Sequence, residues 1–270
     1  FPYTTLFRSW YDSIFRQYAD WGVDYVKCDD IAREYPHCRR EIEVISEACR
    51  SCGREIVLSL SPGPAPLEQA EHLKKHANLW RITDDFWDDW RALYNMFERC
   101  EKWSIHNGAG HFADADMLPL GAIRQDYSPD DRTKFTKDEQ ITMMTLWSIF
   151  RSPLILGGEL TKTDELTLSL ITNEEIIRMN KCSRHAHQVF RRKLLGTEIV
   201  LWTAVCSEGG QYAALFNIGE NDCEITLPLT ELEISGTACC TDLWSGEKYA
   251  AAAHIKASLK KHGAAAFLLS

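Results

Sequence analysis

The chain has 270 residues, of which 45% are hydrophobic and 26% are charged, so it can bury a core in one or two globular domains. It carries 30 Lys and Arg against 39 Asp and Glu, a formal net charge of −9. This acidic balance excludes nucleic acid as an expected partner. No apolar run reaches the ~18 residues that cross a bilayer, so we expect no membrane insertion.

Residues 10–183 alternate between predicted helices and predicted strands. Apolar residues that recur every three or four positions indicate the helices, and short β-branched and apolar runs indicate the strands. The expected helices cover 11–21, 36–50, 67–77 and 88–103, and a further helix begins with the capping box Thr136-x-x-Glu139. The expected strands cover 23–29, 55–61, 79–83, 112–117 and 154–157. This alternation predicts an α/β fold with a parallel sheet.

After about Ser183 the pattern changes to short alternating runs separated by glycine-containing turns. Runs of this kind are typical of antiparallel strands. The expected strands cover 198–204, 211–218, 223–227 and 265–269. The sequence therefore predicts a second, all-β domain over residues 184–270.

Ten cysteines form no framework typical of a small secreted protein, because the chain is long enough to fold without cross-links. Cys49-x-x-Cys52 would need a second pair of ligands nearby to indicate a metal or redox site, and the sequence shows none. Free thiols are typical of a reducing, cytoplasmic compartment, and nothing else in the sequence indicates a location.

Acidic side chains follow three of the predicted strands. They are Asp29-Asp30, Asp84-Asp85 and Asp114-x-Asp116. In parallel α/β folds, functional groups gather at the carboxyl ends of the strands. An aspartate at such a place usually caps the next helix, and this is the role that we expect for Asp30, Asp84 and Asp88.

Lys27 and Asp29 stand two residues apart, so their side chains lie on the same face of a strand. Inside a barrel they are costly unless they pair or act chemically, and a nearby Lys⁺ favours the ionised carboxylate that a nucleophile requires. Two converging carboxylates, one anionic and one protonated, carry out glycoside hydrolysis. A metal site on the same acids is the alternative, and the positive charges of Lys27 and Arg81 disfavour it.

Four segments stand in the order and spacing of one known family. They read YADWGVDYVKCD (18–29), WRITDDFWDDW (80–90), FADADML (112–118) and LWSI with SPL (146–149 and 152–154). They resemble the nucleophile, acid/base, "WNDPDML" and barrel-closing segments of the family 27 glycoside hydrolases, the α-galactosidases and α-N-acetylgalactosaminidases. The likeness runs from about Trp10 to the C-terminal end.

The resemblance implies a (β/α)8 TIM barrel that lacks its first three βα units, followed by an antiparallel β-sandwich. Residues 10–183 would then supply barrel strands 4–8, and residues 184–270 would form the sandwich. It also implies a carbohydrate substrate, with neither a metal nor an organic cofactor.

The implied activity is a retaining exo-glycosidase that removes terminal α-D-galactosyl residues by double displacement. Carried over residue by residue, Asp29 would be the nucleophile and Asp85 the general acid/base. The residues that would line the sugar site are Lys27, Ser61, Arg81, Asp116 and Met117.

The residue that faces carbon 2 of the sugar stays open. Where α-galactosidases of the animal type have a glutamate, this chain has Ser61, which resembles the N-acetylgalactosaminidase branch, although Ser61-Pro62-Gly63-Pro64 matches neither branch. α-N-Acetylgalactosaminidase, β-L-arabinopyranosidase and isomalto-dextranase therefore remain alternatives. A non-catalytic carbohydrate-binding protein is the further alternative.

Residues 1–9, FPYTTLFRS, show no cap or apolar period that would start an element, and they lack the features of a secretory signal. A common sequencing-adapter oligonucleotide can encode the same nine residues. We therefore expect an artefact in front of a truncated gene, and we expect the 270-residue chain by itself to be inactive. The sequence does not indicate an oligomeric state.

Overall fold

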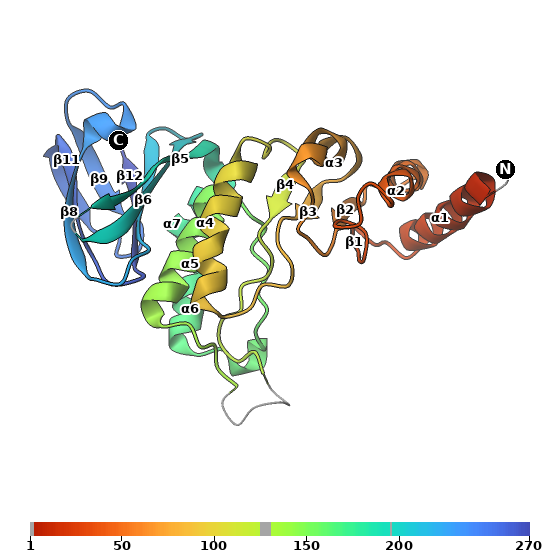
Figure 1. Ribbon diagram of the computed structural model, residues 1–270, viewed down its shortest axis with the longest axis horizontal. Coiled ribbons are helices and arrows are strands. Elements are labelled where there is room, and N and C mark those ends of the chain that lie inside the picture. Colours follow the sequence, from red (N-terminus) through yellow and green to blue (C-terminus); the bar gives the residue numbers. More distant parts are fainter. Residues whose placement is uncertain (1–2, 125–130, 195) are drawn as a thin grey trace. The chain divides into compact units, whose positions relative to one another are not determined.

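A computed structural model describes residues 3–124, 131–194 and 196–270. The chain forms two compact units (Figure 1). The first unit consists of Phe1–Asp85 and His106–Asp116, and the second of Phe86–Ile105 and Met117–Ser270. Among the described residues, no helix combines the length and the hydrophobicity needed to cross a membrane.

The first unit is built on a four-stranded parallel sheet with the strand order β1-β2-β3-β4. Its strands are β1 (Tyr25–Cys28), β2 (Val57–Leu60), β3 (Leu79–Arg81) and β4 (Phe112–Asp114). Its helices are α1 (Tyr3–Asp20), α2 (Arg39–Ser51), the 3-10 turn η1 (Leu67–Gln69) and α3 (Ala70–His76). The predicted parallel sheet is confirmed, and each of these strands lies within a range predicted from the sequence.

Helix α2 shows why the local pattern suffices to place such an element. Its residues Ile42, Ile45 and Cys49 are all buried, as their spacing on one helical face predicts. Cys49 is held further by its thiol, which donates a hydrogen bond of 3.3 Å to the carbonyl of Ile56.

The prediction that residues 1–9 start no element is wrong for the described part of this stretch, because α1 begins at Tyr3. Residues 1 and 2 lie outside the described residues. Adding a turn to an existing helix gains one hydrogen bond per residue without a new nucleation step, so the helix predicted from residue 11 extends towards the N-terminus.

The predicted strand 154–157 is reduced to an isolated parallel bridge between Leu118 and Leu156 in the second unit. Two hydrogen bonds form it: the N–H of Leu118 donates to the carbonyl of Ile155, and the N–H of Gly157 donates to the carbonyl of Leu118. Pro153 has no N–H to extend this ladder, and Gly157 has no side chain to pack on it.

The second unit contains an antiparallel β-sandwich, as predicted. One sheet has the strand order β10-β9-β12-β7-β6-β5, and β11 pairs with β8 in the other. The strands are β5 (Ser183–Leu194), β6 (Thr197–Cys206), β7 (Gln211–Asn217), β8 (Cys223–Pro228), β9 (Ala238–Asp242), β10 (Lys248–Ala252), β11 (His254–Leu259) and β12 (Ala264–Leu269). The 3-10 turn η3 (Leu229–Leu232) follows β8.

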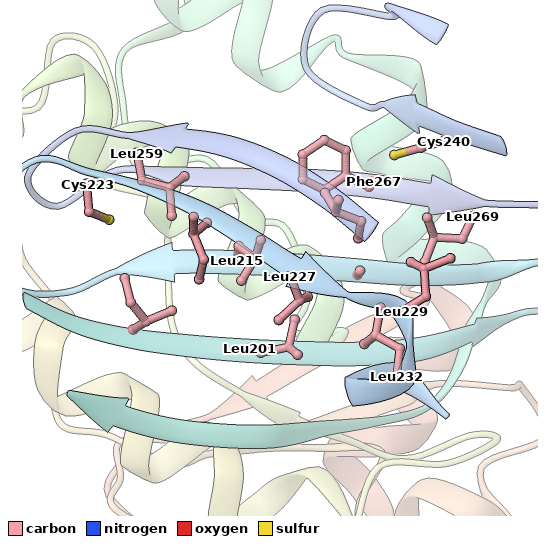
Figure 2. Packing of buried hydrophobic residues seen from close by; sticks show 14 residues of the cluster. Leu201, Leu215, Cys223, Leu227, Leu229, Leu232, Cys240, Leu259, Phe267 and Leu269 are labelled. Atoms are coloured by element: carbon pink, nitrogen blue, oxygen red, sulfur yellow. The ribbon is translucent and has the colours of Figure 1, made fainter. Parts of the chain in front are cut away.

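The two sheets share a core of apolar side chains (Figure 2). Leu201 and Leu215 reach it from β6 and β7, Leu227 from β8, Leu259 from β11 and Phe267 from β12. All five are at most 2% exposed, so alternate residues of both sheets point inwards, as in other β-sandwiches.

The helices of the second unit are α4 (Trp90–Ser104), α5 (Lys137–Phe150), α6 (Glu165–Ile171) and α7 (Glu174–Cys182), with the 3-10 turn η2 (Leu160–Lys162) before α6. The predicted capping box at the start of α5 is confirmed, because Thr136 and Glu139 each accept a hydrogen bond from the other's backbone N–H. Helix α5 is apolar nearly all round because it packs against α7, β7 and β12.

Candidate active site

The carboxyl ends of the parallel strands bring most of the predicted site residues to one edge of the first unit's sheet. In the register of this sheet, Lys27 pairs with Ser59, and Arg81 pairs with Asp114. Side chains two residues apart point to the same face, so one face carries an uninterrupted polar group. Its members are Lys27, Asp29, Ser61, Arg81 and Asp114.

Backbone hydrogen bonds extend the pairing of β1 and β2 past the strand ends and fix the place of Asp29. The N–H of Ser61 donates to the carbonyl of Cys28 at 2.9 Å, and the N–H of Ile31 donates to the carbonyl of Ser61 at 3.0 Å. Asp29 lies between these bonds with an exposed side chain. Its neighbour Asp30 has a φ of 57°, a left-handed conformation that aspartate tolerates better than most residues.

A buried arginine joins two of the predicted site carboxylates. Arg81 is 1% exposed, and its two terminal nitrogens lie 3.2 Å from Oδ1 of Asp85 and 2.8 Å from Oδ1 of Asp116. The planar guanidinium can hold both acids at once in a fixed geometry. Asp85 itself projects into solvent, with 71% of its side chain exposed. Its carboxylate is therefore positioned by the buried Arg81 and remains accessible to a ligand from solvent.

Asp114 is a site residue to which the sequence assigned no role beyond its place at a strand end. It is 4% exposed, and this burial raises its pKa to about 6. A hydrogen bond of 2.8 Å from the N–H of Asp116 to its Oδ1 and the positive charges of Arg81 and Lys27 oppose that rise. The same hydrogen bond shapes the turn in which Asp116 adopts a φ of 80°.

The loop after Ser61 packs against the backbone of β3 and its extension. The N–H of Gly63 donates to the carbonyl of Thr83 at 3.0 Å, and the N–H of Ala65 donates to the carbonyl of Arg81 at 2.9 Å. A Cβ on Gly63 would lie 2.4 Å from the Arg81 carbonyl oxygen, so only glycine allows this approach. The loop thereby fixes buried Ser61 close to the stretch that carries Arg81 and Asp85.

Met117 follows Asp116 directly in the chain but belongs to the second unit. There its side chain packs against Gly157, where an added Cβ would lie 2.5 Å from the methionine sulfur. The structure therefore brings together Lys27, Asp29, Ser61, Arg81, Asp85 and Asp116 within the first unit, and it places Met117 at the start of the next segment.

The three aspartates expected to cap helices do not do so, and these predictions are wrong. Helix α4 is capped by Asp89, which accepts a hydrogen bond from the N–H of Ala92, and α2 follows Cys38 without a side-chain cap. Asp84 instead accepts from the N–H of Asp85 and from Arg33. Sequence alone could not separate Asp88 from Asp89, because both stand within one turn of the start of α4.

Asp88 is buried in the second unit and binds Arg124 through both carboxylate oxygens. It also accepts a hydrogen bond of 2.6 Å from the N–H of Lys134. Although burial acts in the opposite direction, these contacts together lower the pKa of Asp88. The Asp88–Arg124 pair joins segments that are 36 residues apart in the chain, so no local sequence pattern predicts it.

The arrangement at the sheet edge suits chemistry with two carboxylates. Asp29 and Asp85 are both exposed. Backbone hydrogen bonds on either side of Asp29 fix its position, and Arg81 fixes that of Asp85. The cationic side chains of Lys27 and Arg81 alternate with these acids. Such alternation disfavours a divalent cation there. Among the described residues, the side chains that could share a metal ion are Glu43, His72 and His76 on α2 and α3.

Comparison with known protein families gives two matches along this chain. Residues 2–182 match the family described as "Alpha galactosidase A", and residues 196–269 match the "Alpha galactosidase C-terminal beta sandwich domain". Alpha-galactosidase 2 of Arabidopsis thaliana is 25% identical over 236 residues, which cover 87% of this chain and 56% of that protein.

Two solved structures are more similar in sequence. A β-L-arabinopyranosidase of glycoside hydrolase family 27 from Geobacillus stearothermophilus is 47% identical with a TM-score of 0.91, over 97% of this chain and 61% of that one. A putative α-N-acetylgalactosaminidase from Bacillus halodurans C-125 is 44% identical with a TM-score of 0.82, over 97% and 62%. The chain thus spans 56–62% of the length of these three relatives. Their architecture confirms the predicted fold class.

Proposed function

Because the chain belongs to glycoside hydrolase family 27, we propose that the whole protein is a retaining exo-glycosidase that releases a terminal sugar of galacto configuration. The observation that carries this proposal is the strand-end geometry of the first unit. Buried Arg81 holds exposed Asp85 and largely buried Asp116 next to the sheet face that bears Asp29.

In the proposed mechanism, Asp29 attacks the anomeric carbon while Asp85 protonates the departing glycosidic oxygen. The bond from carbon to the leaving group breaks as the bond to the Asp29 carboxylate forms. Asp85, now ionised, then removes a proton from water, which attacks the glycosyl–enzyme and frees Asp29. This double displacement requires the two carboxyl groups to lie ~5–5.5 Å apart.

The remaining site residues are proposed to bind the sugar. Lys27, Arg81, Asp116 and Met117 would line the ring, and Ser61 would face the substituent at carbon 2. Ser61 is 1% exposed and directly follows Leu60, which pairs with Trp80 of β3, so its hydroxyl would offer a short, rigidly placed contact rather than the long reach of a glutamate.

Several sugars of galacto configuration fit this proposal, N-acetylgalactosamine among them, and we favour two. The sequence favours α-D-galactosyl residues, and the 24–27% identical plant, fungal and slime-mould relatives named as α-galactosidases agree with it. β-L-Arabinopyranose has the same ring configuration without the hydroxymethyl group at carbon 5. It is the second candidate, because the Geobacillus β-L-arabinopyranosidase is 47% identical over 97% of the chain.

The test uses a chimera, in which residues 10–270 follow the part of the Geobacillus enzyme that this chain does not match. We expect turnover of aryl glycosides and a loss of at least about 10³-fold in Asp29→Asn. Asp30→Asn, the same substitution at the next residue, is the matched control, and its turnover should stay within a few-fold of that of the unsubstituted chimera. Azide should restore turnover to Asp29→Gly and yield a glycosyl azide of inverted configuration.

The acid/base role of Asp85 has its own signature. Asp85→Ala should lose about 10²–10⁴-fold on substrates with poor leaving groups and much less on aryl glycosides whose phenols need no proton. Equal losses on both substrate classes would overturn this role, and an active Asp29→Asn would overturn the mechanism. The ratio of activities on aryl α-D-galactoside and aryl β-L-arabinopyranoside, compared with that of the Geobacillus parent, decides which sugar these residues favour.

A further inference from the structure

A histidine pair and a glutamate come together on two neighbouring helices of the first unit. His72 and His76 stand one turn apart on α3, with ring centroids 4.5 Å apart, and Glu43 reaches them from α2. One candidate ligand atom from each of the three residues lies within 4.8 Å of those of the other two. Nε2 of His72 is 3.3 Å from Oε1 of Glu43.

The two histidines differ in how their nitrogens are used. Nδ1 of His72 lies 3.0 Å from the hydroxyl of Tyr35, so both nitrogens of that buried ring have partners. Nδ1 of His76 is buried and has no hydrogen-bond partner among the residues that the structure describes. A buried polar atom left in this way is costly, and an ion or a water that binds it is the usual explanation.

We propose that Glu43, His72 and His76 bind one divalent transition-metal ion of the zinc class. Two imidazole nitrogens and one carboxylate oxygen form a ligand set that zinc uses in proteins, with a fourth position left for water. Metal–nitrogen bonds are about 2.0–2.1 Å long, so small side-chain rotations suffice to close the three ligands around an ion.

The surroundings of the cluster support ligation. With Nε2 on the metal, Nδ1–H of His72 donates to the Tyr35 hydroxyl, and contacts of this kind orient metal-bound histidines.

Nearby cations limit the affinity. Arg40 contacts Oε2 of Glu43 at 2.6 Å, and Arg39 lies 3.9 Å from Oε1. The positive charges of Arg39 and Arg40 oppose the binding of a metal cation, so we expect a dissociation constant in the micromolar range. His72 and His76 lie on α3, which precedes the amino end of β3, and Glu43 lies on α2, so the ion would tie α2 to α3 and stabilise the unit.

The experiment titrates the metal-free 270-residue chain with Co²⁺ under a reducing agent and follows visible absorption. Ten free cysteines compete for metals, but a thiolate ligand adds an intense charge-transfer band in the near ultraviolet that a nitrogen–oxygen site lacks. We expect one equivalent of Co²⁺ with d–d bands and without that charge-transfer band, and Zn²⁺ should displace it.

His76→Ala and Glu43→Gln should each weaken this binding by at least about 10-fold, and Tyr35→Phe by about 10-fold through the orientation of His72. His254→Ala, at an exposed histidine of β11, is the matched control and should bind as the wild type does. Equal uptake by wild type, His76→Ala and Glu43→Gln, or uptake by thiolates alone, would overturn the proposal. Circular dichroism checks folding, and if His76→Ala misfolds, Glu43→Gln decides.

Discussion

Replacing Asp114 with asparagine tests the electrostatics of the candidate site most directly. Burial raises the pKa of this carboxyl from 3.8 to about 6, so the folded state holds its proton more tightly than the unfolded state does. The stabilisation is complete below the unfolded pKa and is lost as pH rises through about 6. Above that pH, the wild-type protein has lost about 3 kcal/mol of unfolding free energy relative to its stability at low pH.

Asp114→Asn keeps the shape of the side chain and the oxygen that accepts from the N–H of Asp116, but it cannot ionise. The variant should therefore gain about 2 kcal/mol of stability relative to wild type between about pH 4.5 and pH 7.5. Because the chain has two units, local hydrogen exchange in β3 and β4, corrected for the intrinsic rate at each pH, is the suitable measurement.

Asp30→Asn removes one exposed charge from the same sheet edge and is the control for net charge. A stability difference between wild type and Asp114→Asn that stays constant over this pH range would refute the reasoning. So would a difference of the opposite sign, because it would mean that Arg81 and Lys27 outweigh the cost of burial.

Three further changes test the packing around the site and in the second unit. Arg81→Lys should cost about 1–3 kcal/mol in denaturant unfolding of the first unit, because one ammonium cannot hold both Asp85 and Asp116; an unchanged midpoint would contradict this. Gly63→Ala should cost about 1–3 kcal/mol in the same measurement, because its Cβ would lie 2.4 Å from a carbonyl oxygen of β3; a neutral result would show that the loop can move away. Thr136→Ala should lower protection of α5 from hydrogen exchange by about 1 kcal/mol through loss of the N-cap, whereas equal exchange would mean that burial alone fixes the helix start.

Much of the candidate site could be predicted from the sequence because it depends on local order. The two-residue spacing of Lys27 and Asp29 decides that both face one side of β1, whatever surrounds the strand. Asp85 stands four residues after Arg81, and the structure joins the two in an ion pair. The roles of Asp29 and Asp85 in catalysis remain predictions that the chimera tests.

Helix and strand type were also predictable where the periodicity was strong. The buried faces of α2 and the capping box of α5 are short-range features, fixed by side chains within one or two turns. The boundaries of helices and strands were less predictable. Helix α1 begins at Tyr3 because a helix propagates beyond the residues with the strongest apolar periodicity. The predicted strand 154–157 is only a bridge, because Pro153 lacks an N–H and Gly157 lacks a side chain.

The sequence by itself determined the order of the α/β and β-sandwich parts, the polar face at the strand ends and the identity of its acids. Only the tertiary structure decided that Arg81 binds Asp116 as well as Asp85, that burial perturbs Asp114, and that Glu43 meets two histidines from α3. The physical reason is that burial and charge pairing depend on segments distant in the chain. Periodicity and caps, by contrast, depend on neighbours that the sequence already places side by side.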